Sequence, residues 1–387
     1  MSIHLDSKLP NVGTTIFTVM SQLANDCGAI NLSQGFPSFD PPDALIERIT
    51  HYLNSGANQY APMPGIPALR QAIADKTATI HGRGVDVDTE ITISTGATEG
   101  LFSVIQAVVR PGDEVIVFDP AYDSYEPAVN LAGGKARHVS LGIEENGCDF
   151  AVDWQQLNDA VNDRTRLIIC NFPHNPTGAI LSAADLDRLA DVVRDTNIFL
   201  LSDEVYEHIV FDGNEHRSLL RHDELWPRSF VVSSFGKTFH ATGWKVGFCI
   251  APRDLTAEFR RVHQFTTFTV VTPIQCALAD YLQSNPEFYQ QLAGFYQQKR
   301  DHFCRLLDGS PFKFKPARST FFQLLDYSEL SDEHDETLAK EWTRSIGVAS
   351  IPLSVFCETP FTGQRLRFCF AKSDKELEQA VEKLRSA

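Results

Sequence analysis

The chain has 387 residues, of which 43% are hydrophobic and 22% are charged, and its formal net charge at pH 7 is −16. These proportions are typical of a globular protein with a large core, and no uncharged apolar stretch reaches the roughly 18 residues that a membrane helix needs. The negative charge argues against a nucleic-acid or anionic-membrane partner, because both require a basic surface. It leaves room for a small anionic ligand held by a few cations in a cleft.

The first residues, MSIHLDSKLPNVGTT, contain no basic segment followed by an apolar one. We therefore expect no secretory signal and a cytoplasmic protein. The eight cysteines are widely separated, and none is in the paired spacing of a zinc site. Most of them lie in apolar runs, so we expect buried free thiols and no metal.

The middle of the chain alternates short apolar runs with periodic stretches such as 98–109 and 183–194. This alternation is typical of βαβ units and predicts an α/β fold with a mostly parallel sheet. The predicted strands are 91–94, 114–118, 166–171, 198–202, 230–234 and 246–251.

The pattern changes from about Phe288. A long helical stretch is followed by short strands at 320–325 and 366–370 and by a closing helix at 374–384. These elements predict a smaller α+β domain. We expect a large domain at 36–287 and a small domain formed by residues 1–35 and 288–387.

Four predicted strands run directly into polar or glycine-containing segments, at 95–98, 173–178, 203–206 and 235–237. In open α/β sheets, ligands bind at the carboxyl ends of the strands. Four such strand ends therefore predict one shared site.

Lys237 follows one of these strands, in the segment SSFGKTFHATGWKVG at 233–247. Taken alone, such a lysine is most often an ordinary surface residue. Here Ser234, Lys245 and three glycines surround it. A sequestered lysine is shifted toward its neutral, nucleophilic form and can form a Schiff base with an aldehyde. A hydroxyl and a second cation nearby can hold a phosphate.

This segment resembles the lysine motif of the class I/II aminotransferases of fold type I, which depend on pyridoxal 5′-phosphate (PLP). The resemblance extends from Gly35-Phe36-Pro37 to an arginine near the end of the chain. It implies a mostly parallel seven-stranded sheet flanked by helices, with a smaller α+β domain, and a homodimer with shared active sites. It also implies that Lys237 is the Schiff-base lysine and that Ser234 and Lys245 bind the phosphate. Many relatives carry arginine where Lys245 stands.

Three further residues gain a role from the resemblance. Asn175, in the turn-like segment NFPHNPTG at 171–178, matches the residue that hydrogen-bonds the cofactor's ring hydroxyl and the substrate carboxylate. A direct role for Asn171 stays open. Asp203 matches the carboxylate that keeps the pyridine nitrogen protonated, with a structural ion pair as the alternative. Tyr206 matches the tyrosine that hydrogen-bonds the ring oxygen.

The segment STGATEG at 94–100 is either an ordinary helix start or a phosphate site. The resemblance favours the phosphate site and assigns Gly96, Ala97 and Thr98 to it. Tyr122 matches the aromatic residue that stacks on the cofactor ring, with core packing as the alternative. Tyr60 matches a tyrosine that reaches the phosphate of the neighbouring subunit's cofactor.

Arg367 lies inside an apolar run, where its charge must be paired. Guanidinium binds carboxylate bidentately, and the family's arginine for the substrate α-carboxylate matches Arg367. Arg365 is a competing assignment, because alternation puts it on the same face. Gly35 matches a backbone contact to the same carboxylate. The candidate side-chain pocket is apolar or aromatic and comprises Phe17, Phe36, Tyr60, Tyr122 and Phe268.

The resemblance implies ping-pong transfer of an amino group from an amino acid to a 2-oxo acid, with Lys237 moving the proton. Motifs at 33–37, 58–63 and 351–356 are most similar to bacterial methionine aminotransferases, and next to kynurenine and glutamine aminotransferases. No second arginine for a side-chain carboxylate is evident, so we expect methionine and aromatic donors. A PLP-dependent cysteine-conjugate β-lyase is the alternative. A sensor module of a DNA-binding regulator is disfavoured by the acidic charge.

Overall fold

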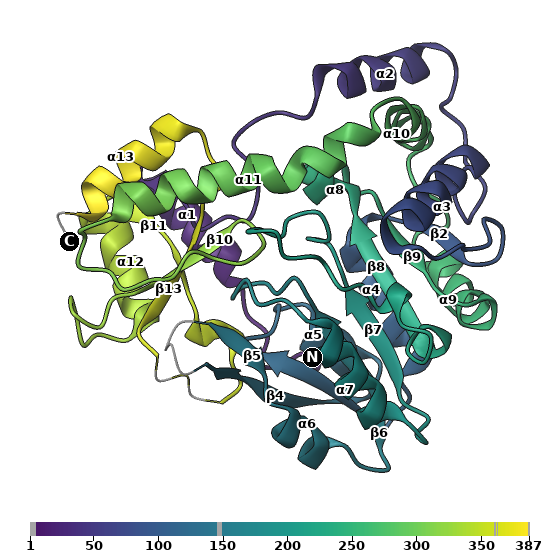
Figure 1. Ribbon diagram of the computed structural model, residues 1–387, viewed down its shortest axis with the longest axis horizontal. Helices are drawn as coiled ribbons and strands as arrows, with labels where there is room; N and C mark the ends of the chain where they lie inside the picture. Colours follow the sequence, from purple (N-terminus) through teal and green to yellow (C-terminus); the bar gives the residue numbers. More distant parts are fainter. Residues whose placement is uncertain (1–4, 145–148, 360, 362, 386–387) are drawn as a thin grey trace, which may run out of the picture.

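The computed structural model describes residues 5–144, 149–359, 361 and 363–385. Within them the largest sheet has eight strands and is flanked by helices (Figure 1). In sheet order its strands are β2 (Ile91–Ser94), β9 (Gly247–Ile250), β8 (Ser229–Ser234), β7 (Phe199–Asp203), β6 (Thr165–Asn171), β3 (Glu114–Asp119), β4 (Lys135–Ile143) and β5 (Phe150–Val152). The run from β8 to β4 is parallel, whereas β9 is antiparallel to both of its neighbours and β5 is antiparallel to β4.

The six strands predicted in this region are confirmed, with ends that shift by at most one residue. The described sheet has eight strands rather than the seven expected, because the three-residue β5 pairs with β4 and extends the edge. Neither β4 nor β5 was among the predicted strands. Lys135 and Arg137 are exposed and Ala136 and His138 are half-buried, so the first half of β4 contains no apolar run.

The helices that accompany this sheet are α2 (Asp43–Asn54), α3 (Pro67–His81), α4 (Gly96–Val108), α5 (Tyr125–Leu131), α6 (Trp154–Ala160), α7 (Ala183–Val193), α8 (Phe235–Thr238), α9 (Arg253–Thr266) and α10 (Thr272–Ser284). Strand alternation divides the core into two layers. Val115 and Val117 of β3 pack in the layer that contains α4, and Ile116 and Phe118 pack in the layer that contains α7. Both faces of the parallel strands are therefore covered, as is usual in α/β proteins.

The C-terminal part contains α11 (Pro286–Leu307), β10 (Phe322–Asp326), α12 (Asp335–Ser345), β11 (Val348–Ala349), β12 (Ile351–Pro352), β13 (Arg365–Cys369) and α13 (Asp374–Leu384). Its antiparallel sheet has the order β10-β13-β12. The predicted closing helix is confirmed at both ends. Ser373 caps this helix in a box with Glu376, which explains why it begins there.

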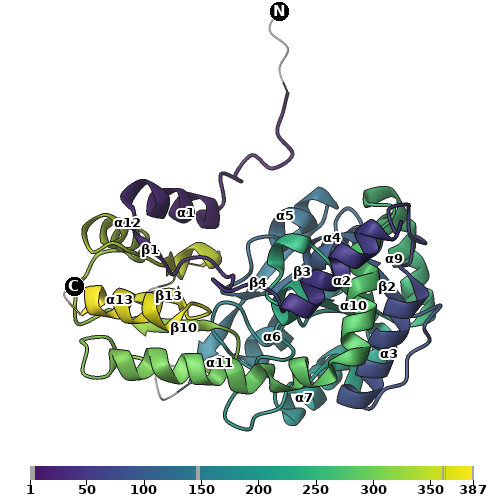
Figure 2. The same ribbon diagram turned by 90° about the horizontal axis from the view of Figure 1, so that it is seen from above.

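The N-terminal segment joins this part of the molecule. The strand β1 (Ile30–Asn31) pairs in parallel with β11, and α1 (Ile16–Cys27) packs against α12 (Figure 2). These contacts support the small domain expected from residues 1–35 and 288–387, although the division at 36–287 stays a prediction. The described residues before α1 extend away from the rest of the chain (Figure 2).

No helix among the described residues combines the length and the apolar character needed to cross a membrane. All seven described cysteines are free thiols; Cys148 lies outside the described residues. Cys170, Cys249 and Cys369 are buried as expected, but Cys27 is exposed because it ends α1 on the surface.

Candidate active site

A cavity of about 170 Å³ opens where β6, β7 and β8 end and α4 begins. It brings together all ten residues that were predicted to contact the cofactor from the same chain: Gly96, Ala97, Thr98, Tyr122, Asn175, Asp203, Tyr206, Ser234, Lys237 and Lys245. Leu101, Asn171, Val205 and Thr242 complete the lining. Strand ends that are far apart in the sequence therefore form one site, as the parallel sheet requires.

Lys237 stands on the short helix α8, which follows β8 directly. The Ser234 hydroxyl caps this helix by accepting from the Gly236 amide at 3.2 Å. A Cβ at Gly236 would lie 2.9 Å from the Thr242 Cα, so only glycine fits this turn. The Lys237 Nζ donates to the Gly35 carbonyl at 2.7 Å. Burial lowers the pKa of the Lys237 amine to about 8, which favours its nucleophilic form.

Asp203 ends β7 opposite Asn171 of β6. Burial raises the pKa of its carboxyl group to about 6, against the effect of the Tyr125 hydroxyl, which donates to Oδ2 at 2.6 Å. The Asn171 side chain donates to the Asp203 carbonyl at 3.2 Å and accepts from the Asn175 amide at 3.0 Å. Among the described residues Asp203 has no ion-pair partner within 4.0 Å, so the structural ion pair is not formed.

The start of α4 and Lys245 form the cationic end of the cavity. Gly96 has φ 71° and Lys245 has φ 54°, so both backbones are in the left-handed region. A Cβ at Gly96 would lie 3.3 Å from the Lys245 Nζ, which shows how closely this amine approaches the helix start. Free N–H groups at a helix N-terminus together with a cation suit a phosphate.

Arg367 of β13 is fully buried. Its Nη1 donates to the Asn175 Oδ1 at 2.7 Å and its Nη2 donates to the Ser33 carbonyl at 3.0 Å. Its Nε is buried and has no hydrogen-bond partner among the described residues. Burial lowers the pKa of Arg367 to about 10, so the group remains a cation at neutral pH. It lacks an anionic partner within 4.0 Å in the described chain and is open to a carboxylate ligand.

Three aromatic rings surround this guanidinium group. The ring centres of Phe322, Phe17 and Phe356 lie 4.0, 5.3 and 5.6 Å from its central carbon. Phe17, a predicted substrate contact, thus lies beside Arg367, because α1 packs against the C-terminal part. Neither arginine is among the residues that line the cavity, but Arg367 bonds Asn175, which does, whereas the competing Arg365 lies 3.9 Å from the Asp326 carboxylate. The structure therefore favours Arg367 as the carboxylate-binding arginine.

Three of the predicted site residues are exposed on the surface of their own chain. Tyr60 is 82% exposed and Phe268 is 51% exposed, and their rings meet edge to face at 5.4 Å. Phe36 is also exposed.

Sequence reasoning missed Tyr125, Phe322 and Phe356. Tyr125 lies three residues after Tyr122 in the segment that was already selected, and its burial beside a carboxylate is the only signal that distinguishes it. The two phenylalanines gave no sequence signal, because their position over Arg367 depends on tertiary packing.

Comparison with known proteins agrees with this geometry. The family Aminotransferase class I and II matches residues 28–384. A methionine aminotransferase of Escherichia coli (strain K12) is 51% identical over 379 residues, which cover 98% of this chain and 97% of that protein. The chain is a class I and II aminotransferase.

The similarity to solved structures and to further relatives covers nearly the whole chain. An Escherichia coli protein whose structure and reactivity identify a methionine aminotransferase function has a TM-score of 0.97 and 50% identity, with 100% of both chains covered. The N-succinyldiaminopimelate aminotransferase of Mycobacterium tuberculosis has a TM-score of 0.95 and 36% identity, with 99% of this chain and 100% of that chain covered. A kynurenine–oxoglutarate transaminase of Dictyostelium discoideum is 35% identical, covering 96% of this chain and 94% of that protein.

The aminotransferase is a PLP-dependent transaminase of fold type I, and the residues of its cavity fit this cofactor. An amine of lowered pKa suits the cofactor's aldehyde, a buried carboxylate suits its ring nitrogen, and the cationic end suits its phosphate. The unpaired Arg367 Nε suits the carboxylate of an amino acid beside it.

Proposed function

We propose that this aminotransferase transfers the amino group of methionine or an aromatic amino acid to a 2-oxo acid by a ping-pong mechanism. Kynurenine and glutamine are further candidate donors. The observation that carries the proposal is the set of three phenylalanine rings around the Arg367 guanidinium, whose Nε has no hydrogen-bond partner among the described residues. Aromatic rings make favourable contacts with a thioether or another ring. The 51% identity to a methionine aminotransferase supports the same choice.

PLP supplies an electron sink for the electrons released when the substrate's Cα loses its proton. Lys237 would hold the cofactor and, when freed by the substrate, move this proton. Asp203 would keep the ring nitrogen protonated, while Asn175 and Tyr206 would hydrogen-bond the ring oxygen.

The remaining cofactor contacts follow from the shape of the cavity. We assign the phosphate to Ser234, Lys245 and the N-terminus of α4, where Gly96, Ala97 and Thr98 stand. We assign ring stacking to Tyr122, which lines the same cavity.

On the substrate side, Arg367 would bind the α-carboxylate with help from Asn175 and the Gly35 backbone. Asn175 already accepts a hydrogen bond from Arg367, and Gly35 accepts one from Lys237, so each of them contacts one of the two cations. Phe17 would contact the substrate side chain.

We further propose a homodimer in which Tyr60 and Phe268 act at the partner's site. Support comes from a neighbouring group of exposed apolar side chains, in which Phe265 is 87% exposed and Val271 is 53% exposed. Burying such a group against a second copy is favourable. The extended segment before α1 offers further contact area (Figure 2). The cytoplasmic location also stays a proposal, which cell fractionation tests.

A panel of amino donors, assayed with one 2-oxo acid acceptor, tests the substrate class. We expect kcat/KM for methionine and phenylalanine to exceed that for aspartate by about tenfold or more, because none of the described residues that line the cavity is an arginine that could pair with a side-chain carboxylate. Faster turnover of aspartate would overturn the proposal. The relatives reported above are all aminotransferases and give no support to the cysteine-conjugate β-lyase alternative. Formation of pyruvate and ammonia in the absence of a 2-oxo acid acceptor would support the β-lyase alternative.

A further inference from the structure

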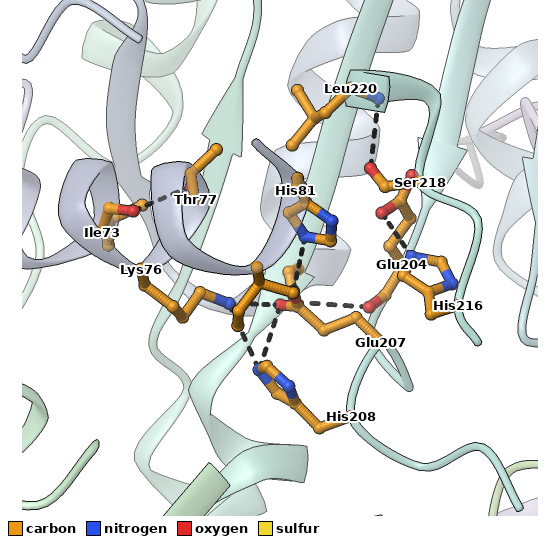
Figure 3. A network of polar contacts seen from close by, with 12 residues as sticks. Ile73, Lys76, Thr77, His81, Glu204, Glu207, His208, His216, Ser218 and Leu220 are labelled. Carbon is orange, nitrogen blue, oxygen red and sulfur yellow. Dashed lines mark hydrogen bonds and ion pairs between the residues drawn. The ribbon is translucent and has the colours of Figure 1, made fainter. Parts of the chain in front are cut away.

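A buried polar network surrounds Glu204 and Glu207, in the segment that follows β7 (Figure 3). We call it the Glu204–Glu207 network. Its members come from α3, from β7 and β8, and from the segment after β7, and none of them lines the cavity. They are Lys76, His81, Ser202, Glu204, Glu207, His208, His216 and Ser233.

Residues 203–207 have two faces. Asp203 and Tyr206 line the cavity, whereas Glu204 and Glu207 belong to the network. The exposed fractions of Glu204 and Glu207 are only 1% and 9%. The same turn therefore presents one pair of side chains to the cofactor site and buries two carboxylates on the opposite side.

Glu207 ties the turn to α3 and β8. Its Oε1 lies 2.7 Å from the Lys76 Nζ and accepts from the Ser233 hydroxyl at 2.7 Å. The other oxygen lies 3.4 Å from the His81 Nε2. Burial alone would raise the pKa of Glu207, but Lys76 and the neighbouring His208 hold it well below its ordinary value. Glu207 is therefore an anion inside the protein.

Glu204 ties the same turn to the segment that leads into the short helix η1 (Leu219–Arg221). Its Oε2 lies 2.7 Å from the His216 Nε2, and its Oε1 accepts from the Ser202 hydroxyl at 2.8 Å and from the Leu219 amide at 3.2 Å. The Glu204 amide donates to the Val232 carbonyl of β8 at 2.8 Å. Both side chain and backbone of Glu204 are thus fixed.

Such a network adds little to stability. Taking a carboxylate and an ammonium out of water costs several kcal/mol for each ion, so apolar residues of similar size often replace a buried pair without loss. Because hydrogen bonds are directional, the network instead restricts the groups that it joins to a single geometry. The groups held here are the neighbours of Asp203 and Tyr206.

We propose that Glu204 and Glu207 are positioning residues of the transamination site. The ion pair with Lys76 and the contact with His216 anchor the 203–207 turn to α3 and to the 216–219 segment. This anchoring keeps Asp203 and Tyr206 in the orientation that the cofactor ring needs. The inference rests on the proposed function, because it assumes that both residues face PLP.

Two variants of the Lys76–Glu207 pair test the inference. Glu207→Gln keeps the size of the side chain and removes its charge. The double variant Lys76→Met with Glu207→Leu removes both charges and leaves no unpaired ion. The readouts are the Kd of the apoenzyme for PLP, the pH midpoint of the visible band of the cofactor-loaded enzyme, and the Tm. For both variants we expect Kd to rise about tenfold and the midpoint to shift, even where Tm is close to wild type.

A matched control removes a second ion pair outside the cavity lining. Arg300 has a 4% exposed side chain, and its Nη2 donates to the Asp212 Oδ1 at 2.8 Å. Arg300→Met with Asp212→Asn should leave the PLP Kd and the pH midpoint unchanged whatever it does to Tm.

A double variant of normal Tm that binds PLP and titrates like wild type would overturn the inference, since the network would then be purely structural. If the double variant does not fold, the same readouts on Glu207→Gln decide. If the wild-type protein forms no visible band with PLP, the proposed function itself is wrong. If the wild-type band is normal and the variants keep the wild-type Kd and pH midpoint, only this inference is wrong.

Discussion

Lys237 shows how burial prepares a reactive group. Its pKa is lowered to about 8, first by burial and further by Arg367 and Lys245. The unfolded chain holds the same proton up to a pH of about 10.5. Between these values the unfolded state binds more protons, so native stability rises with pH through this window. Below about pH 8 the buried ammonium destabilises the apoenzyme in full.

We therefore predict that Lys237→Met makes the apoenzyme more stable at pH 7, by up to roughly 3 kcal/mol. The gain should shrink at pH 9, where the wild-type amine is mostly neutral. Urea unfolding of both apoproteins at the two pH values measures this. Equal stability at pH 7 would mean that the native amine is not desolvated.

Arg367 offers a second prediction at this scale. Lysine keeps the charge at this position but loses the planar fork that pairs with both carboxylate oxygens. We predict that Arg367→Lys lowers kcat/KM for methionine by about 10- to 100-fold, mainly through KM. Arg365→Lys, on the same strand but beside the Asp326 carboxylate, is the control and should change kcat/KM less than about threefold. A larger effect at Arg365 would reverse the assignment.

The sequence could select most of the residues that line the cavity, because their types and spacing follow strand ends. It could not assign Phe322 or Phe356, which are ordinary apolar residues until β10 and the short helix η4 (Ser354–Phe356) pack beside Arg367. The choice between Arg365 and Arg367 was open for the same reason, since alternation puts both on one face.

At the scale of elements, two features at the start of α4 favour glycine at position 96: its backbone conformation and its closeness to Lys245. Gly96 has a positive φ of 71°, and a Cβ there would lie 3.3 Å from the Lys245 Nζ. Both demands concern the cationic end of the cavity, where we place the phosphate.

We predict that Gly96→Ala weakens PLP binding by about tenfold and lowers stability by about 1 kcal/mol. Gly82→Ala is the matched control, because Gly82 has a φ of +69° and nothing within 4 Å of an added Cβ. The control should lose similar stability without a change in the Kd for PLP. If both variants change the Kd for PLP equally, backbone strain alone accounts for the change, and the position of Gly96 at the cavity does not.

Element boundaries were predictable where local signals agree. The helix at 374–384 has a capping box, and the six strands predicted between 91 and 251 are apolar runs that end in turns. The strand β4 was not predictable, because its first half is largely polar and gains its place only by pairing with β3 and β5.

At the scale of the whole molecule, the site depends on segments near the beginning and the end of the sequence that come together only when the chain folds. Arg367 bonds the Ser33 carbonyl, and β1 pairs with β11. Periodicity carries no information about such contacts, so the sequence supported them through family resemblance alone. The same resemblance suggests a second chain, since Tyr60 and Phe268 face solvent in a single one.

A mixing experiment tests the shared site. Lys237→Ala lacks the reactive amine, and Tyr60→Ala lacks the group proposed to reach the partner's cofactor. In a mixed dimer one site combines an intact Lys237 with an intact Tyr60. Random mixing should therefore restore about one quarter of wild-type activity, together with a solution mass of twice 43.2 kDa. If the mixture has only the average activity of the two parent variants, Tyr60 acts at the active site of its own chain or at no active site.

The absorbance spectrum of the purified protein with PLP, taken before and after adding methionine without a 2-oxo acid, tests transamination at Lys237 most directly. We predict a visible band that is absent in Lys237→Ala. Methionine should convert it to the shorter-wavelength pyridoxamine form, with release of the matching 2-oxo acid. A band that methionine leaves unchanged would contradict the assigned donor. The absence of any band, even with excess PLP, would contradict the assignment of Lys237 and of the site built around it.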